Sequence, residues 1–220
     1  MGGKADMAEF TLYCFSESGN SYKVALMLAL CGADWEPKGV KFFGGETRSP
    51  EYRAVNAMGE APVLVHHRPD GPNGGDFTLS QSGAILIYLS RHFGKFGHQT
   101  EAEEYEILRW ILFDNHKLTS YTATERFMRH FRGKAGDPAA EFIYSRAQDA
   151  WKILDTHLTG REWVAASRPT IADLSLCGYL FWPQQIAADW ADYPAVSAWL
   201  ERIKALPGWA MPEDLMPSGM

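Results

Sequence analysis

A polar loop near the N-terminus holds the residue types best suited to chemistry. Ser18, Asn20 and Ser21 lie in it, and the almost wholly apolar segment 24–30 follows closely. A turn-forming loop ahead of an apolar helix leaves backbone N–H groups unpaired at the positive end of the helix dipole. A thiolate is stabilised at such a position. A serine hydroxyl in this loop is therefore a candidate activator of a bound thiol.

The energies involved are small enough for one such hydroxyl. A free thiol has a pKa of about 8.5, so only a few per cent of it is ionised at neutral pH. Each unit by which that pKa falls needs about 1.4 kcal/mol, and a hydrogen bond to a charged acceptor contributes about 1.5–3 kcal/mol. The alternative is that Ser18, Asn20 and Ser21 are turn and N-cap residues, a role that can coexist with catalysis.

The elements that must position this loop alternate between strand and helix. Strands are predicted at 10–15, 35–43, 61–66 and 76–79, and helices at 24–31, 49–52 and 84–93. The turn-forming segment 70–75 makes the last two strands a hairpin. The predicted order is βαβ followed by ββα, with no internal repeat.

The pattern becomes helical after a predicted linker at 94–99. Helices are predicted at 101–121, 138–158, 174–181 and 194–206. Thr170 and Asp173 form a capping box ahead of the third of them, and this role accounts fully for the carboxylate of Asp173. We therefore expect an α/β domain over 8–93 and an all-helical domain over 100–220.

Composition excludes several classes of function. The 220 residues include 46% hydrophobic and 22% charged residues, as in an ordinary globular protein. The net charge is −6, so no basic excess favours nucleic acid as a partner. No stretch of 18 apolar residues is present, and no membrane association is expected.

The cysteines and histidines do not indicate a metal site. Cys14, Cys31 and Cys177 are widely spaced, and no CxxC, HxE or HExxH spacing occurs. The sequence also lacks a glycine-rich phosphate loop and a GxSxG elbow. An odd number of cysteines without a secretory signal indicates reduced, buried thiols and a cytoplasmic location.

Taken together, the motifs resemble those of the cytosolic glutathione transferase family over essentially the whole chain. Each motif is weak alone, but the four occur in order and at the family's spacing. They are the strand–loop–helix segment 12–24, N-A-M-G-E-A-P-V-L at 56–64, L-S-Q-S-G-A-I at 79–85 and R-P-T-I-A-D at 168–173. The resemblance implies a thioredoxin-like domain followed by a helical-bundle domain.

The resemblance also implies how the thiol of glutathione is activated. Ser18 aligns with the catalytic serine of zeta-like members, and Ser18 and Asn20 have the spacing of a Thr–Asn pair in nu-like bacterial members. Beta-like members have a cysteine at the position of Gly19, so their mixed-disulfide chemistry is not expected here. The tyrosine that other classes use would lie near Tyr13.

The resemblance implies that further residues bind glutathione. The bond between Ala61 and Pro62 is cis in the family, which turns the Ala61 backbone toward the cysteinyl part of the ligand. Ser82 and Gln81 would bind the γ-glutamyl part, Gln81 standing where the family usually has an acid. Two remaining positions, Lys41 and the backbone of Glu60, are candidates near the glycine carboxylate.

The resemblance implies that the helical domain forms one side of a pocket for an electrophilic acceptor between the domains. Trp110, Asn115 and Tyr121 are the candidates, although helical spacing cannot place all residues of that segment on one face. The resemblance implies a homodimeric enzyme that uses glutathione as co-substrate, without metal, for conjugation or for peroxide or disulfide reduction. The alternative is a non-catalytic binding or scaffold protein of the same fold.

Overall fold

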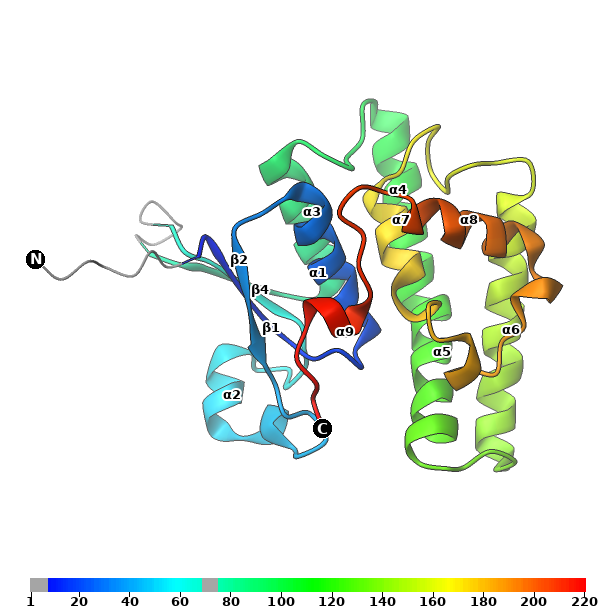
Figure 1. The fold of residues 1–220 in the computed structure, drawn as a ribbon, viewed down its shortest axis with the longest axis horizontal. Helices are drawn as coiled ribbons and strands as arrows, with labels where there is room; N and C mark the ends of the chain where they lie inside the picture. The colour runs from blue at the N-terminus through cyan, green and yellow to red at the C-terminus, as the bar shows by residue number, and fades with distance from the viewer. Residues whose placement is uncertain (1–7, 69–74) are drawn as a thin grey trace, which may run out of the picture. The chain divides into compact units, whose positions relative to one another are not determined.

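The computed structural model describes residues 8–68 and 75–220, so most of the predicted turn at 70–75 lies outside the described residues. The chain divides into two compact units (Figure 1). The first unit comprises residues up to Leu89 together with Pro207–Met220, and the second comprises Ser90–Leu206.

A four-stranded sheet forms the centre of the first unit. Its order is β2-β1-β3-β4. The strands are β1 (Phe10–Cys14), β2 (Trp35–Gly39), β3 (Val63–His66) and β4 (Phe77–Ser80). β1 pairs in parallel with β2 and antiparallel with β3, and β3 pairs antiparallel with β4. The predicted βαβ-ββα order is confirmed.

The second strand is shorter than predicted. β2 ends at Gly39 rather than at 43, because the chain turns sharply there. The amide of Phe42 donates to the carbonyl of Val40 (2.8 Å), and Gly45 adopts a left-handed φ of 82°. Residues 40–45 therefore form a loop beside the C-terminal end of β1.

Three helices complete the βαβ-ββα part. They are α1 (Gly19–Cys31), α2 (Pro50–Val55) and α3 (Ser82–Phe93). α1 is buried along most of its length, as its apolar sequence predicts, and it ends at Gly32, whose φ of 66° suits glycine. The N-termini of α1 and α3 therefore both lie in the first unit.

The second unit is helical. It contains α4 (Glu101–Phe113), α5 (Thr119–Arg126), α6 (Pro138–Leu158), α7 (Ile171–Leu176) and α8 (Pro194–Lys204). α4 and α5 are joined by a π-helical segment, Asp114–Leu118, where a single helix is predicted. The predicted capping box at Thr170 and Asp173 is present at the start of α7.

The C-terminal segment differs from the domain boundary expected at 100–220. Residues 207–220, including α9 (Pro212–Leu215), pack on the first unit (Figure 1). The hydroxyl of Tyr22 in α1 donates to the carbonyl of Ala210 (2.8 Å), and Gly208 packs against α1 at the carbonyl of Ala29. No helix in the described ranges is long and apolar enough to cross a bilayer.

Candidate functional site

The first turn of α1 presents the predicted thiol activator. Ser18 is the N-cap residue, and its Oγ accepts a hydrogen bond from the backbone N–H of Ser21 (3.1 Å). The side chain is only 5% exposed. Because the oxygen accepts in the cap, the hydroxyl hydrogen can still be donated to an anion. Capping and thiol activation are therefore compatible at Ser18.

A second helix N-terminus meets the first. The hydroxyl of Ser82, the first residue of α3, donates to Oδ1 of Asn20 (3.4 Å). Since the amide oxygen of Asn20 accepts there, its NH₂ group is directed elsewhere as a donor. The structure thus brings Ser18, Asn20 and Ser82 together, and both helix dipoles favour negative charge at this place.

Gln81 precedes α3 in an unusual backbone conformation. Its φ is 70°, in the left-handed region that non-glycine residues seldom adopt. Its side-chain amide donates to a carboxylate oxygen of Glu60 (3.1 Å) and to the sulfur of Met58 (3.1 Å). Backbone strain of this kind often marks a ligand-binding position. The Gln81–Glu60 pair adds a negative charge next to the N-terminus of α3.

The turn before β3 is held by its own polar groups. The carbonyl of Glu60 accepts from Nδ2 of Asn56 (2.7 Å) and from the hydroxyl of Tyr52 (3.0 Å). Burial, followed by the charge of Glu46, raises the pKa of Tyr52 to about 12, so the phenol remains a donor. The bond between Ala61 and Pro62 is cis, as the resemblance implies.

Gly59 is required by the same turn. It has a left-handed φ of 67°, and a Cβ atom on it would lie 2.8 Å from the carbonyl oxygen of Thr47. A side chain there would push the turn apart. The motif at 56–64 is thus a compact support for the backbone of Ala61 and for the carboxylate of Glu60.

Lys41 and Tyr13 are not joined to this group. Lys41 lies exposed in the loop after β2, where its backbone N–H donates to the carboxylate of Glu46 (2.7 Å). Tyr13 points from β1 into a separate cavity of about 570 Å³, and its hydroxyl accepts from Lys38 (3.1 Å). Tyr13 is therefore not part of the group formed by Ser18, Asn20 and Ser82.

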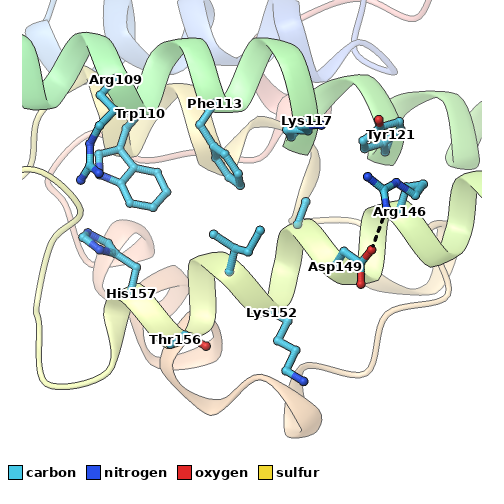
Figure 2. A pocket seen from close by; sticks show the side chains of 12 residues that line it. Arg109, Trp110, Phe113, Lys117, Tyr121, Arg146, Asp149, Lys152, Thr156 and His157 are labelled. Atoms are coloured by element: carbon cyan, nitrogen blue, oxygen red, sulfur yellow. Dashed lines mark hydrogen bonds and ion pairs between the residues drawn. The ribbon is translucent and has the colours of Figure 1, made fainter.

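The second unit has a cavity of about 790 Å³ between α4–α5 and α6 (Figure 2). Trp110 and Tyr121 both line it. The ring of Trp110 contacts Phe113 (5.2 Å between ring centroids) and His157 (4.3 Å). Basic side chains surround the aromatic surface. They are Arg109, Lys117, Arg146 and Lys152, of which Arg146 is paired with Asp149 at 3.2 Å.

Asn115 is separated from the other two predicted pocket residues. Trp110, Lys117 and Tyr121 lie on the side of the helix that lines the cavity, whereas Asn115 is exposed on another side. Five residues along a helix turn a side chain well away from its starting direction. The carbonyl of Asn115 accepts from the hydroxyl of Ser120 (2.7 Å). The structure therefore supports two of the three as neighbours.

The protein's own thiols are poorly placed to act as nucleophiles. Cys14 and Cys177 are buried, Cys31 is half-buried, and none of these three cysteines takes part in a disulfide. Burial raises the pKa of Cys14 to about 12, from an ordinary value near 9. A thiolate at the α1 N-terminus must therefore come from a ligand.

Glu17, beside the site, was missed by sequence reasoning, and Ser21 was named only as a loop and cap residue. Glu17 accepts hydrogen bonds from Ser218 and Gly219, about two hundred residues away, and no local signal indicates such a contact. Ser21 has a fully buried hydroxyl without a hydrogen-bond partner in the described part of the chain. Only its backbone N–H takes part in the cap.

Comparisons with known proteins agree with this geometry. Residues 8–91 match the family model described as the glutathione S-transferase N-terminal domain, and residues 145–207 match the C-terminal domain. The disulfide-bond oxidoreductase YfcG of Escherichia coli is 28% identical over 195 residues, which is 88% of this chain and 89% of that protein.

Solved structures are similar over nearly the whole chain. A possible glutathione S-transferase from Rhodopseudomonas palustris is 32% identical with a TM-score of 0.84, covering 94% of this chain and 98% of that one. A glutathione transferase from Burkholderia graminis, solved with two glutathione molecules bound per subunit, is 26% identical with a TM-score of 0.81, covering 93% and 87%. The chain belongs to the glutathione S-transferase family.

Proposed function

We propose that the protein binds glutathione at the N-termini of α1 and α3 and holds its sulfur as a thiolate. The observation that carries the proposal is the Ser18 cap, in which the oxygen accepts from Ser21 while the hydrogen remains available to the sulfur. Asn20 lies in the same turn and accepts from Ser82 through its amide oxygen, so its NH₂ group can donate to the sulfur, and the dipole of α1 adds to the field. As a family member, the protein is a glutathione-dependent transferase or reductase.

The remaining groups of the first unit position the tripeptide. When glutathione binds, the hydroxyl of Ser82 turns its hydrogen from Asn20, 3.4 Å away, to the γ-glutamyl carboxylate, which also accepts from the N–H groups of the first turn of α3. The ammonium group lies beside Gln81, and the carboxylate of Glu60 supplies the negative charge that Gln81 lacks. The backbone of Ala61, preceding Pro62, pairs with the cysteinyl residue. Lys41 is the proposed partner of the glycine carboxylate.

Two reactions use the same thiolate. In conjugation, the sulfur attacks an electrophilic carbon, a C–S bond forms and the leaving group departs with the bonding electron pair. In disulfide reduction, the sulfur attacks one sulfur of a disulfide, a mixed disulfide with glutathione forms and the other thiolate leaves. The relative named as a disulfide-bond oxidoreductase supports the second reaction beside the first.

The acceptor is proposed to be a small, partly aromatic electrophile. Trp110 and Tyr121 remain candidates for holding it, because both line one cavity in the second unit. Asn115, which is exposed outside that cavity, is a candidate only for an acceptor that reaches another face of the helix.

A homodimer is proposed from an exposed apolar stripe. Tyr105, Leu108 and Leu112 follow one another at three- and four-residue spacing along α4, and they are 64%, 38% and 58% exposed. Exposed apolar stripes of this kind are typical of protein interfaces. The stripe supports association with a second copy of the chain, in keeping with the family.

The experiment is titration calorimetry of glutathione into wild type and Ser82→Ala, with turnover of chlorodinitrobenzene and hydroxyethyl disulfide. Wild type should bind and turn over at least one acceptor, and Ser82→Ala should bind about tenfold more weakly. Ser120→Ala, which removes an exposed hydroxyl on α5, is the control. Binding without turnover of a broad acceptor panel would favour the non-catalytic scaffold; no binding would refute both readings.

A further inference from the structure

Residues 217–219 lie against the loop that carries Ser18. The backbone N–H of Ser16 donates to the carbonyl of Pro217 (2.9 Å). Figure 1 shows this C-terminal segment following α9 beside α1 and ending near the loop after β2. The contact joins the chain's last described residues to the segment between β1 and α1.

The side chain of Glu17 strengthens this contact. Its carboxylate accepts from the hydroxyl of Ser218 (2.6 Å) and from the backbone N–H of Gly219 (2.9 Å). Glu17 directly precedes the N-cap residue Ser18. Two hydrogen bonds to one carboxylate therefore restrict the backbone immediately before the cap.

Gly219 approaches Phe15 more closely than any side chain would allow. A Cβ atom at position 219 would lie 2.9 Å from Cβ and from two ring atoms of Phe15. The ring of Phe15 is stacked on Phe42 at 4.8 Å, and it is buried. The glycine is thus fitted to a ring whose position is set from its other side.

The same residue also binds the neighbouring loop. The carbonyl of Gly219 accepts from the backbone N–H of Phe43 (3.2 Å), two residues after Lys41. The segment therefore bridges the loop that carries Ser18 and the loop that carries Lys41. These two loops hold groups proposed to contact different parts of glutathione, the thiol and the glycine carboxylate.

We propose that residues 217–219 are a positioning element for Ser18, acting through Glu17 and Phe15. The inference rests on the proposed function, because it assigns the segment a part in thiolate formation. With the segment docked, the Ser18 hydroxyl is held where it donates to the glutathione sulfur. With the segment displaced, the cap loosens and the thiolate is less well stabilised.

The test compares wild type with Gly219→Ala and Ser218→Ala in the full chain. Gly219→Ala collides with Phe15, whereas Ser218→Ala removes the two hydrogen bonds of the Ser218 hydroxyl, to Glu17 and from the backbone N–H of Met220, without adding a clash. The matched control is Gly75→Ala, because a Cβ at Gly75 meets nothing within 4 Å. The measurements are amide hydrogen exchange over residues 15–24 and thiolate absorbance of bound glutathione near 240 nm against pH.

Gly219→Ala should speed exchange over 15–24 and raise the pKa of the bound thiol by about one unit, which lowers kcat at neutral pH by up to about tenfold. Ser218→Ala should do the same to a smaller extent, and the control should do neither. Unchanged exchange, or faster exchange with an unchanged thiol pKa, would overturn the proposal. Failure of the proposed function is distinguishable, because wild type itself would then form no glutathione thiolate and both ideas would fall.

Discussion

The hydroxyl of Ser82 lies 3.4 Å from the amide oxygen of Asn20, which joins the first turn of α3 to the first turn of α1. The two residues are 62 positions apart in the sequence, and the contact places two helix N-termini around one site. Backbone N–H groups and positive dipole ends then face the same place. Glutathione carries two carboxylates and a thiol that can ionise, so this arrangement matches its charge.

The contact between Glu60 and Gln81 predicts that the negative charge of the site can be moved from position 60 to position 81. Glu60→Gln removes the carboxylate that accepts from Gln81, and glutathione affinity should fall about fivefold, or roughly 1 kcal/mol for an exposed charge. Adding Gln81→Glu to that variant returns a carboxylate to the neighbouring position and should restore affinity to within about twofold. Calorimetry measures both variants, with the exposed Glu51→Gln in α2 as control. An unchanged affinity in Glu60→Gln would show that the charge is not used.

Replacement of Asp173 is expected to cause a large loss of stability and to leave the candidate site intact. Its carboxylate accepts from the backbone N–H groups of Val164 and Thr170 and from the indole of Trp199, and all three donors are buried. Asp173→Ala leaves these donors without partners, so the free energy of unfolding should fall by at least about 3 kcal/mol. Urea denaturation measures it. Asp189→Ala removes an exposed cap and should lower the free energy of unfolding by only about 1 kcal/mol. Equal losses in the two variants would contradict a special contribution of the buried hydrogen bonds to Asp173.

The apolar stripe on α4 predicts that a charge there separates the subunits. Leu112→Glu should convert the dimer to a monomer in light scattering after size-exclusion chromatography, because the partner would bury an unpaired carboxylate. Thr124→Glu, an exposed position on α5, is the control and should remain dimeric. Wild type that is monomeric at micromolar concentration would contradict the proposed homodimer.

The contacts of Glu17 predict that the docking of residues 217–219 depends on pH. Burial of this carboxyl opposes ionisation, but hydrogen bonds from Ser218 and Gly219 outweigh it and hold the pKa of Glu17 below its ordinary value of 4.5. An acid with a lowered pKa contributes stability above its ordinary value and loses it as pH falls through the lowered one. The Gly219 amide resonance should therefore titrate with a midpoint below 4.5. A midpoint at or above 4.5 would show that the carboxylate does not hold the segment.

Local sequence signals were sufficient for much of the fold. Alternating and apolar segments predicted the strands, and Thr170 with Asp173 predicted a cap that the structure contains. The resemblance carried by the motif at 56–64 implied a cis bond between Ala61 and Pro62, which the structure contains, and Gly59 and Asn56 support this turn through contacts within a dozen residues. Predictions of this kind succeed because the determining contacts are close along the chain.

Contacts between distant segments were not predictable in the same way. Residues 207–220 were assigned to the helical domain by their place in the sequence, yet they dock on α1 and on the loop at 15–17. Asn115 was grouped with Trp110 because the resemblance implied that this helix faces the acceptor, and the structure places Asn115 on a side of the helix away from the cavity. Nothing local to Glu17 indicates that Gly219 is its partner.

The most direct test of the account is the pKa of glutathione's thiol when bound to wild type, Ser18→Ala and Ser21→Ala, read from absorbance near 240 nm. Wild type should lower that pKa by one to two units from about 8.5. In Ser18→Ala the pKa should rise most of the way back to about 8.5. Ser21→Ala removes a buried hydroxyl that has no partner in the described structure, so it should leave the shift unchanged. An unshifted pKa in wild type, or the same shift in Ser18→Ala as in wild type, would contradict the assignment of Ser18 as thiol activator.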